Sequence, residues 1–313
     1  MGTFALFAAG IAALWLGTEL VLRRVPRLAA SFRVSPLVIT VLLLAVLTSM
    51  PELCVSLFAA VRGQASAALG NIVGSNLVTL TFVTALCALY RPIDVSQQIR
   101  DRESSWMILS AALLLLLALD GRIGRTDGAL LCAVYLPYFF ATLRDAKGQR
   151  KHAGQKGAGC RARDYGLFLA GLALIVVGAE FLVRNGTALA RRLGMSDLLI
   201  GITFFAFGTS LPELAIAFGA TLKKTGDVSL GETYASNIFT GSVVVGLIAL
   251  VHPLPVEPLI TRLDLPLLVL AGVILQIFIT TGRRLVRFEA VAIMALYALF
   301  LCSHFFGWHL SLP

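Results

Sequence analysis

The chain repeats itself at a constant offset of 161 residues, and this repeat limits its possible folds more than any other feature. The segment TSMPEL at 48–53 returns as TSLPEL at 209–214. Further identities at the same offset are Gly10, Gly17, Glu19, Gly70, Ser75, Asn76 and Thr79 with Gly171, Gly178, Glu180, Gly231, Ser236, Asn237 and Thr240. Matches at one spacing over so long a stretch indicate an internal duplication.

Composition places the duplicated unit in a membrane. Hydrophobic residues make up 58% of the chain and charged residues only 14%, and the mean hydropathy is +0.87. These values are typical of an integral membrane protein. Apolar runs between polar punctuation predict ten helical spans, near residues 4–22, 35–61, 66–90, 105–119, 127–143, 165–183, 196–221, 230–252, 263–281 and 286–306.

The spans fall into two groups of five. We expect a first five-helix repeat at 1–143, a basic loop at 144–164 and a second five-helix repeat at 165–313. Because five is odd, the second repeat enters the membrane upside down. The predicted fold is an all-α integral membrane protein of ten transmembrane helices in two inverted repeats, an architecture typical of secondary transporters.

Charge predicts the orientation. Of the 26 Lys and Arg residues, 19 fall in the odd-numbered loops, including the loop at 144–164. The positive-inside rule puts these loops in the cytoplasm and both termini outside the cell membrane. This distribution also accounts for the net charge of +9, so the lipid bilayer is an expected partner and nucleic acid is not.

Two prolines stand inside predicted spans. Pro51 and Pro212 cannot donate a backbone hydrogen bond, which frees the carbonyl groups of Leu47 and Gly208. The hydroxyls of the same loosened turns belong to Thr48, Ser49, Thr209 and Ser210. Carbonyl and hydroxyl oxygens together suit a hard cation, although Ser and Thr side chains can also simply satisfy a proline kink.

Each proline is followed by a glutamate. A carboxylate at the centre of the bilayer costs about 2.5–3.5 kcal/mol on insertion scales. Glu52 and Glu213, placed symmetrically, would also repel each other, and one divalent cation would relieve both costs. The empty site favours protonation. The alternative is that internal hydrogen bonds satisfy the two acids.

A third repeated element adds hydroxyls. The segment GNIVGSNLVT at 70–79 is echoed by GETYASNIFT at 231–240. Ser75 and Thr79 share one helical face, and so do Ser236 and Thr240. Their oxygens can complete a coordination shell, while the small residues also permit close helix packing.

These motifs resemble the paired α-repeats of the calcium/cation antiporter superfamily, nearest its sodium/calcium exchanger branch. The resemblance covers nearly the whole chain. It implies that the two repeat glutamates coordinate calcium and that neighbouring hydroxyls complete calcium and sodium sites. The matching positions are Glu52, Glu213, Thr48, Thr209, Ser49, Ser210, Ser75 and Ser236.

Four positions depart from the family pattern, and one of them is Ala235, which replaces the Gly of the second GSN. Thr79 and Thr240 stand where the family usually has Asn or Asp, and they remain candidate ligands with less charge and reach. Glu232 replaces the Asn of the second GN pair. It is either a third ionisable ligand or proton carrier, or a helix N-terminal acid stabilised by the dipole.

The expected function is a secondary active antiporter that exchanges calcium by alternating access. The family resemblance implies that the first and sixth spans move relative to the core. Sodium or protons serve as counter-ion, no cofactor takes part, and the monomer is the working unit. A proton-coupled exchanger of calcium or another divalent cation is the alternative. A membrane enzyme with the two glutamates as an acid/base pair lacks a nucleophile or His cluster, and a non-transporting scaffold is the last alternative.

The remaining charges are predicted to be structural. Glu19 and Glu180 each precede an arginine by four residues, which predicts ion pairs with Arg23 and Arg184. Asp264 lies near an expected loop, as do Asp120, Asp227 and Glu257, and needs no special role. None of the four histidines is expected to be a ligand.

Overall fold

The computed structural model describes residues 2–31, 44–148, 162–222 and 226–305, and the regular structure of these residues is helical apart from four two-residue strands. The first part of the expected second span, 35–43, and most of the basic loop, 149–161, lie outside the described residues. Among the described residues, seven helices are long and apolar enough to cross a membrane, and the bent pair at 197–222 makes an eighth if it forms one span. The fold is that of an all-α membrane protein.

The described part of the first half follows one order of elements. It consists of α1 (Gly2–Ser31), α3 (Leu44–Thr48), α4 (Met50–Val61), α5 (Ala65–Leu77), the π-helix η2 (Val78–Val83), α6 (Thr84–Tyr90), β1 (Ile93–Asp94), the π-helix η3 (Ile99–Glu103), α7 (Ser104–Ala118), β2 (Arg122–Ile123) and α8 (Arg125–Gly148).

The second half follows the same order. It consists of α9 (Ala162–Arg192), α10 (Asp197–Ile200), the π-helix η5 (Gly201–Phe205), α11 (Ala206–Thr209), α12 (Leu211–Leu222), α13 (Gly226–Phe239), the π-helix η6 (Thr240–Val244), α14 (Val245–Val251), β3 (Leu254–Pro255), the π-helix η7 (Ile260–Asp264), α15 (Leu265–Gly282), β4 (Arg284–Leu285) and α16 (Arg287–Phe305). The duplication therefore extends to irregular backbone, since η3 and η7 stand 161 residues apart.

Two of the ten expected spans are short in the structure. The span at 35–61 is described only from residue 44, as α3 and α4, and the span at 105–119 is α7, an α-helix of 15 residues. Their passage through the membrane stays a prediction.

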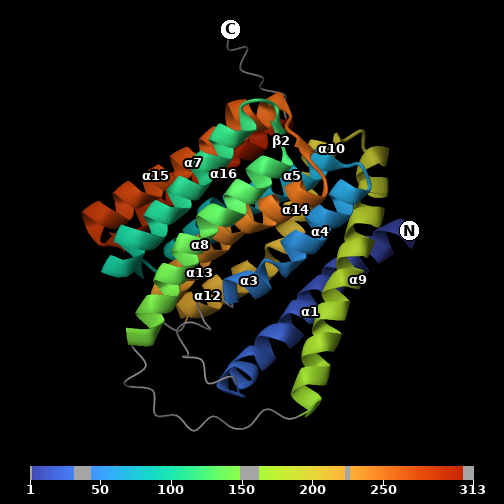
Figure 1. Ribbon diagram of the computed structural model, residues 1–313. Coiled ribbons are helices and arrows are strands. Elements are labelled where there is room, and N and C mark those ends of the chain that lie inside the picture. The colour runs from blue at the N-terminus through green and yellow to red at the C-terminus, as the bar shows by residue number, and fades with distance from the viewer. Residues whose placement is uncertain (1, 32–43, 149–161, 223–225, 306–313) are drawn as a thin grey trace.

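The two long helices α1 and α9 lie side by side at one end of the molecule (Figure 1). Glycine lets their backbones touch. A Cβ on Gly17 would lie 2.7 Å from the carbonyl oxygen of Gly171, and a Cβ on Gly178 would lie 2.9 Å from that of Gly10. Small residues at a helix crossing allow this approach in membranes.

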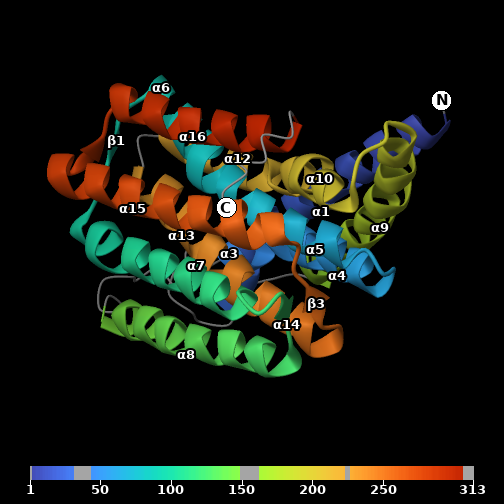
Figure 2. The same cartoon turned by 90° about the horizontal axis from the view of Figure 1, so that it is seen from above.

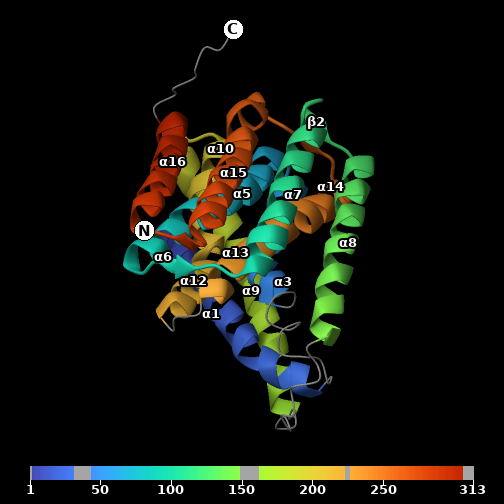
Figure 3. The same ribbon diagram turned by 90° about the vertical axis from the view of Figure 1, so that its left-hand side faces the viewer.

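On the other side of the molecule, four helices stand in a row, in the order α16, α15, α7 and α8 (Figures 2 and 3). Between this row and the α1–α9 pair lie α4, which packs against α5, and α12, which packs against α13. The row is symmetric, because α7 and α15 occupy equivalent places in the two halves, as do α8 and α16.

Short antiparallel strand pairs connect the two halves. Ile93 of β1 pairs with Leu285 of β4, and Ile123 of β2 pairs with Leu254 of β3. Each pair joins two loops that the Lys and Arg count assigns to the same side of the membrane.

The expected ion pair of Glu180 with Arg184 is wrong. Glu19 does bind Arg23, at 2.6 Å, but Glu180 pairs with Arg62 instead. Arg62 follows the last residue of α4, and α4 packs against α9. A partner from a neighbouring helix thus replaces the one four residues away.

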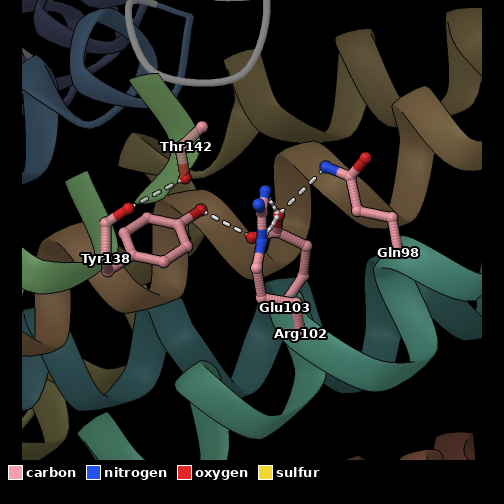
Figure 4. Close-up of polar contacts among 5 residues, drawn as sticks. All are labelled: Gln98, Arg102, Glu103, Tyr138 and Thr142. Carbon is pink, nitrogen blue, oxygen red and sulfur yellow. Dashed lines mark hydrogen bonds and ion pairs between the residues drawn. The ribbon is translucent and has the colours of Figure 1, made fainter. Parts of the chain in front are cut away.

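Asp264 also differs from the expectation, because it is fully buried rather than placed in a loop. Its Oδ1 lies 2.7 Å from Nε2 of His304, whose side chain is only 3% exposed. The equivalent residue of the first half is Glu103, which is buried too. Its carboxylate accepts from the Tyr138 hydroxyl at 2.7 Å and from Arg102 at 2.6 Å (Figure 4). Each half therefore carries a buried acid at the end of a π-helix.

Removal of the hydrogen bond between Tyr138 and Glu103 is expected to lower the stability of the protein. Tyr138→Phe leaves a buried carboxylate oxygen without its donor, so we expect the free energy of unfolding to fall by about 1–3 kcal/mol. Tyr234→Phe is the matched control, because the Tyr234 hydroxyl is buried and has no hydrogen-bond partner in the described residues. Thermal denaturation in detergent measures both. Equal midpoints for the two variants would contradict the assigned role of Tyr138.

Candidate cation site

Two equivalent helix breaks build the centre of the molecule. The chain leaves helical geometry at Ser49, with φ −80° and ψ 3°, and at Ser210, with φ −82° and ψ 2°. Pro51 is then the second residue of α4 and Pro212 the second of α12. The prolines therefore stand in the first turn of a new helix, where proline is tolerated, rather than inside a continuous one. The second break bends the span by 46°.

The breaks place both glutamates in a first helical turn. Glu52 is 0% exposed and Glu213 is 1% exposed. A helix N-terminus favours negative charge. Three of the four carboxylate oxygens nevertheless have no hydrogen-bond partner among the described residues: Oε2 of Glu52 and both oxygens of Glu213. Buried acids without partners are costly, so the site has unused capacity for a positive ligand.

Hydroxyls from one half meet hydroxyls from the other. The Ser75 and Ser210 hydroxyls are 2.8 Å apart, and those of Ser49 and Ser236 are 3.0 Å apart. The Ser75 hydroxyl also lies 3.1 Å from Oε1 of Glu52, to which it can donate. Ser49 and Ser210 are repeat equivalents, as are Ser75 and Ser236, so the two contacts are the same contact exchanged between halves.

Two threonines make a second exchanged pair. The Thr48 hydroxyl lies 3.1 Å from Oε1 of Glu232, and the Thr209 hydroxyl lies 3.3 Å from Oδ1 of Asn71. Both threonine side chains are buried. Because Asn71 and Glu232 are repeat equivalents, the two threonines make the same contact, each with the opposite half.

Thr79 and Thr240 are bound to amides in the structure. Nδ2 of Asn237 donates to the Thr79 hydroxyl at 2.8 Å, and the Thr240 hydroxyl lies 2.5 Å from Oδ1 of Asn76. Nδ2 of Asn76 also lies 3.5 Å from the Asn237 carbonyl oxygen. Two equivalent asparagines therefore meet across the centre, and the structure gives no hydrogen bond from either threonine to a glutamate.

The acids of the site interact with one another. Glu213 is repelled electrostatically by Glu52 and by Glu232, and all three carboxyl groups are buried. In the described part of the chain, no three His, Cys, Asp or Glu side chains come close enough to hold a metal by themselves. A cation here would be held by carboxylate, hydroxyl, amide and carbonyl oxygens together, a donor set that suits hard cations.

Sequence reasoning left several of these residues out. The motifs do not mark Asn71, Asn76 or Asn237 as site residues, and they allow two interpretations of Glu232. Glu232 lies in the interior of α13, 3% exposed, so its interpretation as a helix N-terminal acid is wrong. The signal for the asparagines was present, since the SN pair recurs at the offset of the repeat.

Comparison with known proteins identifies the family. The model of the sodium/calcium exchanger protein family matches residues 2–144 and 164–306. The inner membrane protein YrbG of Escherichia coli is 33% identical over 257 residues, which is 79% of this chain and 79% of that protein. The sodium/calcium exchanger MaX1 of Methanosarcina acetivorans is 27% identical over 344 residues, covering 97% of this chain and 98% of that one.

A solved structure of an exchanger is also similar to this chain. The sodium–calcium exchanger NCX_Mj, soaked with Na⁺ and Sr²⁺, is similar to this chain with a TM-score of 0.71 and 26% identity. The match covers 96% of this chain and 98% of that one. The chain therefore belongs to the sodium/calcium exchanger protein family.

Proposed function

We propose that the protein is a secondary active antiporter that carries calcium across the cell membrane in exchange for another cation, and that it is not an enzyme. The observation that carries the proposal is the pair of buried glutamates, Glu52 and Glu213, with three unpartnered carboxylate oxygens between them. The named exchangers among its relatives support calcium as the cargo.

Charge explains why such a site exchanges rather than leaks. Two ionised glutamates that repel each other inside the membrane are costly when nothing neutralises them. One divalent cation supplies the missing charge, and the hydroxyls of Thr48, Thr209, Ser49, Ser210, Ser75 and Ser236 supply further oxygens. We assign these residues to the ion path, with Thr79 and Thr240 at its edge. Because the site is too costly to change its access while empty, the transport of one cation in one direction requires the transport of another in the opposite direction.

Alternating access is assigned to α1 and α9. These helices pack chiefly against each other through glycine contacts, whereas the site residues lie on the broken helices and on α5 and α13. Since the exchanged hydrogen bonds hold the two halves together, rocking one half against the other would break the site. Sliding of the α1–α9 pair leaves those hydrogen bonds intact.

The topology completes the proposal. Ten spans form two inverted repeats, 1–143 and 165–313, joined by a cytoplasmic loop at 144–164, with both termini outside. Strand pairs that join loops assigned to the same side support this arrangement. The site lies within one chain, which supports a working monomer.

Flux from reconstituted vesicles tests the function. Vesicles containing purified protein are loaded with calcium, and either an inward sodium gradient or an inward pH gradient is applied. We expect one of the gradients to drive calcium out above the rate of protein-free vesicles. Calcium retention under both gradients by folded protein would contradict the antiporter and favour a scaffold.

Two counter-ions compete. Sodium is named in the descriptions of MaX1 and NCX_Mj. The proton is favoured by one feature of this chain, the third buried acid Glu232, which lies beside Thr48 at the site.

A further inference from the structure

We propose that the groove between α1, α6 and α12 binds an anionic phospholipid, with one acyl chain inside the groove and the phosphate group on Arg91. None of the residues assigned to the ion path lines this groove. Its ligand is therefore independent of which ions the protein exchanges.

The lining of the groove is apolar throughout. The groove has a volume of about 630 Å³, is open on one side, and is lined only by Ala, Ile, Leu, Phe, Trp and Gly residues, among them Trp15 of α1, Leu86 of α6 and Phe218 of α12. Trp15 and Leu222 at its rim are 45% and 51% exposed. An unfilled groove would cost its lining residues their dispersion contacts on one side. Inside a membrane, lipid acyl chains are the apolar groups at hand to fill it.

The helices that form the groove end on one side of the membrane. Figure 3 shows α12 next to α6 and α1. Gly226 begins α13, four residues after the end of α12, and a Cβ on it would lie 2.8 Å from the carbonyl oxygen of Asp94 in β1, the strand that follows α6. The Lys and Arg count assigns the ends of α1, α6 and α12 to the cytoplasmic side. The groove therefore runs from Leu211, beside the helix break at Ser210, toward that membrane surface.

Tyr90 stands at the end of the groove that is nearest to this surface. It is the last residue of α6, is 55% exposed, and has its ring centroid 5.4 Å from that of Phe218. Leu86 precedes it by four residues, so the two side chains share one face of α6. Exposed tyrosines at the ends of apolar spans are typical of the membrane–water interface. The groove thus ends at the depth of the lipid headgroups.

Unpaired positive charge lies next to this end. Arg91 follows the last residue of α6, is exposed, and its side chain has no hydrogen-bond or ion-pair partner in the part of the chain that the structure describes. Nε of Arg287 in α16 donates to the Leu89 carbonyl oxygen at 3.0 Å, which brings a second guanidinium group to the end of α6. Arg284, in contrast, already pairs with Asp94 at 3.6 Å. Guanidinium groups bind phosphate oxygens by parallel hydrogen bonds, so Arg91 is the phosphate ligand and Arg287 adds charge beside it.

An apolar chain that carries one negative charge at its end is the chemistry of an anionic phospholipid. Inorganic phosphate would use the arginines and leave the groove unfilled. A second copy of the chain would bring an equal set of arginines to the same surface, because all copies in one membrane share one orientation, and these like charges would repel. The combination of groove and charge therefore favours the lipid.

Lipid binding to the purified protein tests the headgroup. The protein in detergent is titrated with phosphatidylglycerol and, separately, with phosphatidylcholine of the same acyl chains, and the bound molecules are counted by native mass spectrometry. We expect phosphatidylglycerol to bind more tightly. An arginine near the membrane surface strengthens the binding of anionic lipid about fivefold, so Arg91→Gln should weaken phosphatidylglycerol binding by about that factor and leave phosphatidylcholine unchanged.

Arg262→Gln is the matched control for Arg91→Gln. Arg262 lies in η7, in a loop assigned to the opposite side of the membrane, and it is also exposed with no side-chain partner among the described residues. Its replacement removes the same charge and should leave the binding of both lipids as it is.

A second pair of variants tests the groove. Gly219→Leu places a branched side chain in the groove, where a Cβ meets nothing within 4 Å, and should lower the number of tightly bound phosphatidylglycerol molecules by one per chain. Gly166→Leu is its control, because a Cβ on Gly166 in α9 also meets nothing within 4 Å and this residue is not part of the groove. Thermal denaturation without lipid checks that both variants are folded.

Each part of the proposal has a result that overturns it. Equal affinity for the two lipids, or equal losses in Arg91→Gln and Arg262→Gln, would remove the phosphate from Arg91. An unchanged lipid count in Gly219→Leu would remove the acyl chain from the groove. Displacement of the lipid by glycerol phosphate alone would assign the arginines to a free phosphate. A dimer that light scattering detects in the unmodified protein and not in Gly219→Leu would assign the groove to a second copy of the chain.

Discussion

Replacing Glu52 or Glu213 with glutamine is expected to abolish the stabilisation of the protein by calcium. A ligand that binds only the folded state adds about 2.7 kcal/mol to its apparent stability when present at 100 times its dissociation constant. Glutamine keeps the shape of glutamate and removes the charge that a divalent cation needs. The midpoint of thermal denaturation, recorded with and without calcium, should therefore no longer shift in either variant.

Two comparisons sharpen this test. Glu103→Gln removes an equally buried carboxyl group on another helix, and it should keep the calcium-dependent shift even if its stability without calcium is lower. Without calcium, Glu52→Gln and Glu213→Gln should be as stable as the unmodified protein or more so, because a buried glutamine is neutral without a bound proton or cation. A full calcium shift in both site variants would remove the two glutamates from the site.

The largest loss of stability is expected from adding one methyl group at Gly201. A Cβ there would lie 2.4 Å from the carbonyl oxygen of Ala67 and 3.0 Å from the Cα of the same residue. These are backbone atoms of α5, so no side chain can turn away, and α5 must separate from η5. Since α5 carries Asn71 and Ser75, Gly201→Ala should cost at least the ~1–3 kcal/mol typical of an overpacked core and should weaken calcium binding too.

Gly219→Ala is the matched control for Gly201→Ala. Gly219 also lies in a helix, but a Cβ there meets nothing within 4 Å, because the residue lines an open apolar groove of about 630 Å³ between α1, α6 and α12. Alanine favours helix over glycine by about 1 kcal/mol, so this variant should be unchanged or slightly more stable. Equal denaturation midpoints for the two variants would show that η5 and α5 are not packed as closely as described.

The sequence contained most of the local information about the site. The repeat, the prolines and the intramembrane acids predicted where the helices break and which side chains gather there, because spacing along one helix defines its faces. It did not reveal which distant helix each face meets. The pairing of Glu180 with Arg62 depends on how α4 packs against α9, and no local spacing contains that.

Asp264 shows a second limit. Its burial follows from its equivalence to Glu103, yet the partners differ, Tyr138 in one half and His304 in the other. Because one acid is a glutamate and the other an aspartate, a search for identical residues at the offset of 161 does not find this pair. The crossing of Asn76 with Asn237 was hidden for another reason, since contacts between equivalent residues exist only once the halves face each other.

The exchanged hydrogen bonds also affect how the protein is made. Ser49, Ser75 and Thr79 each have a hydrogen-bond partner in the second half, which the ribosome completes last. Until then, the newly made first half lacks these hydrogen bonds. Final docking of its broken helices is consequently a late step of biogenesis, and a chain truncated in the middle would be a natural target for membrane proteases.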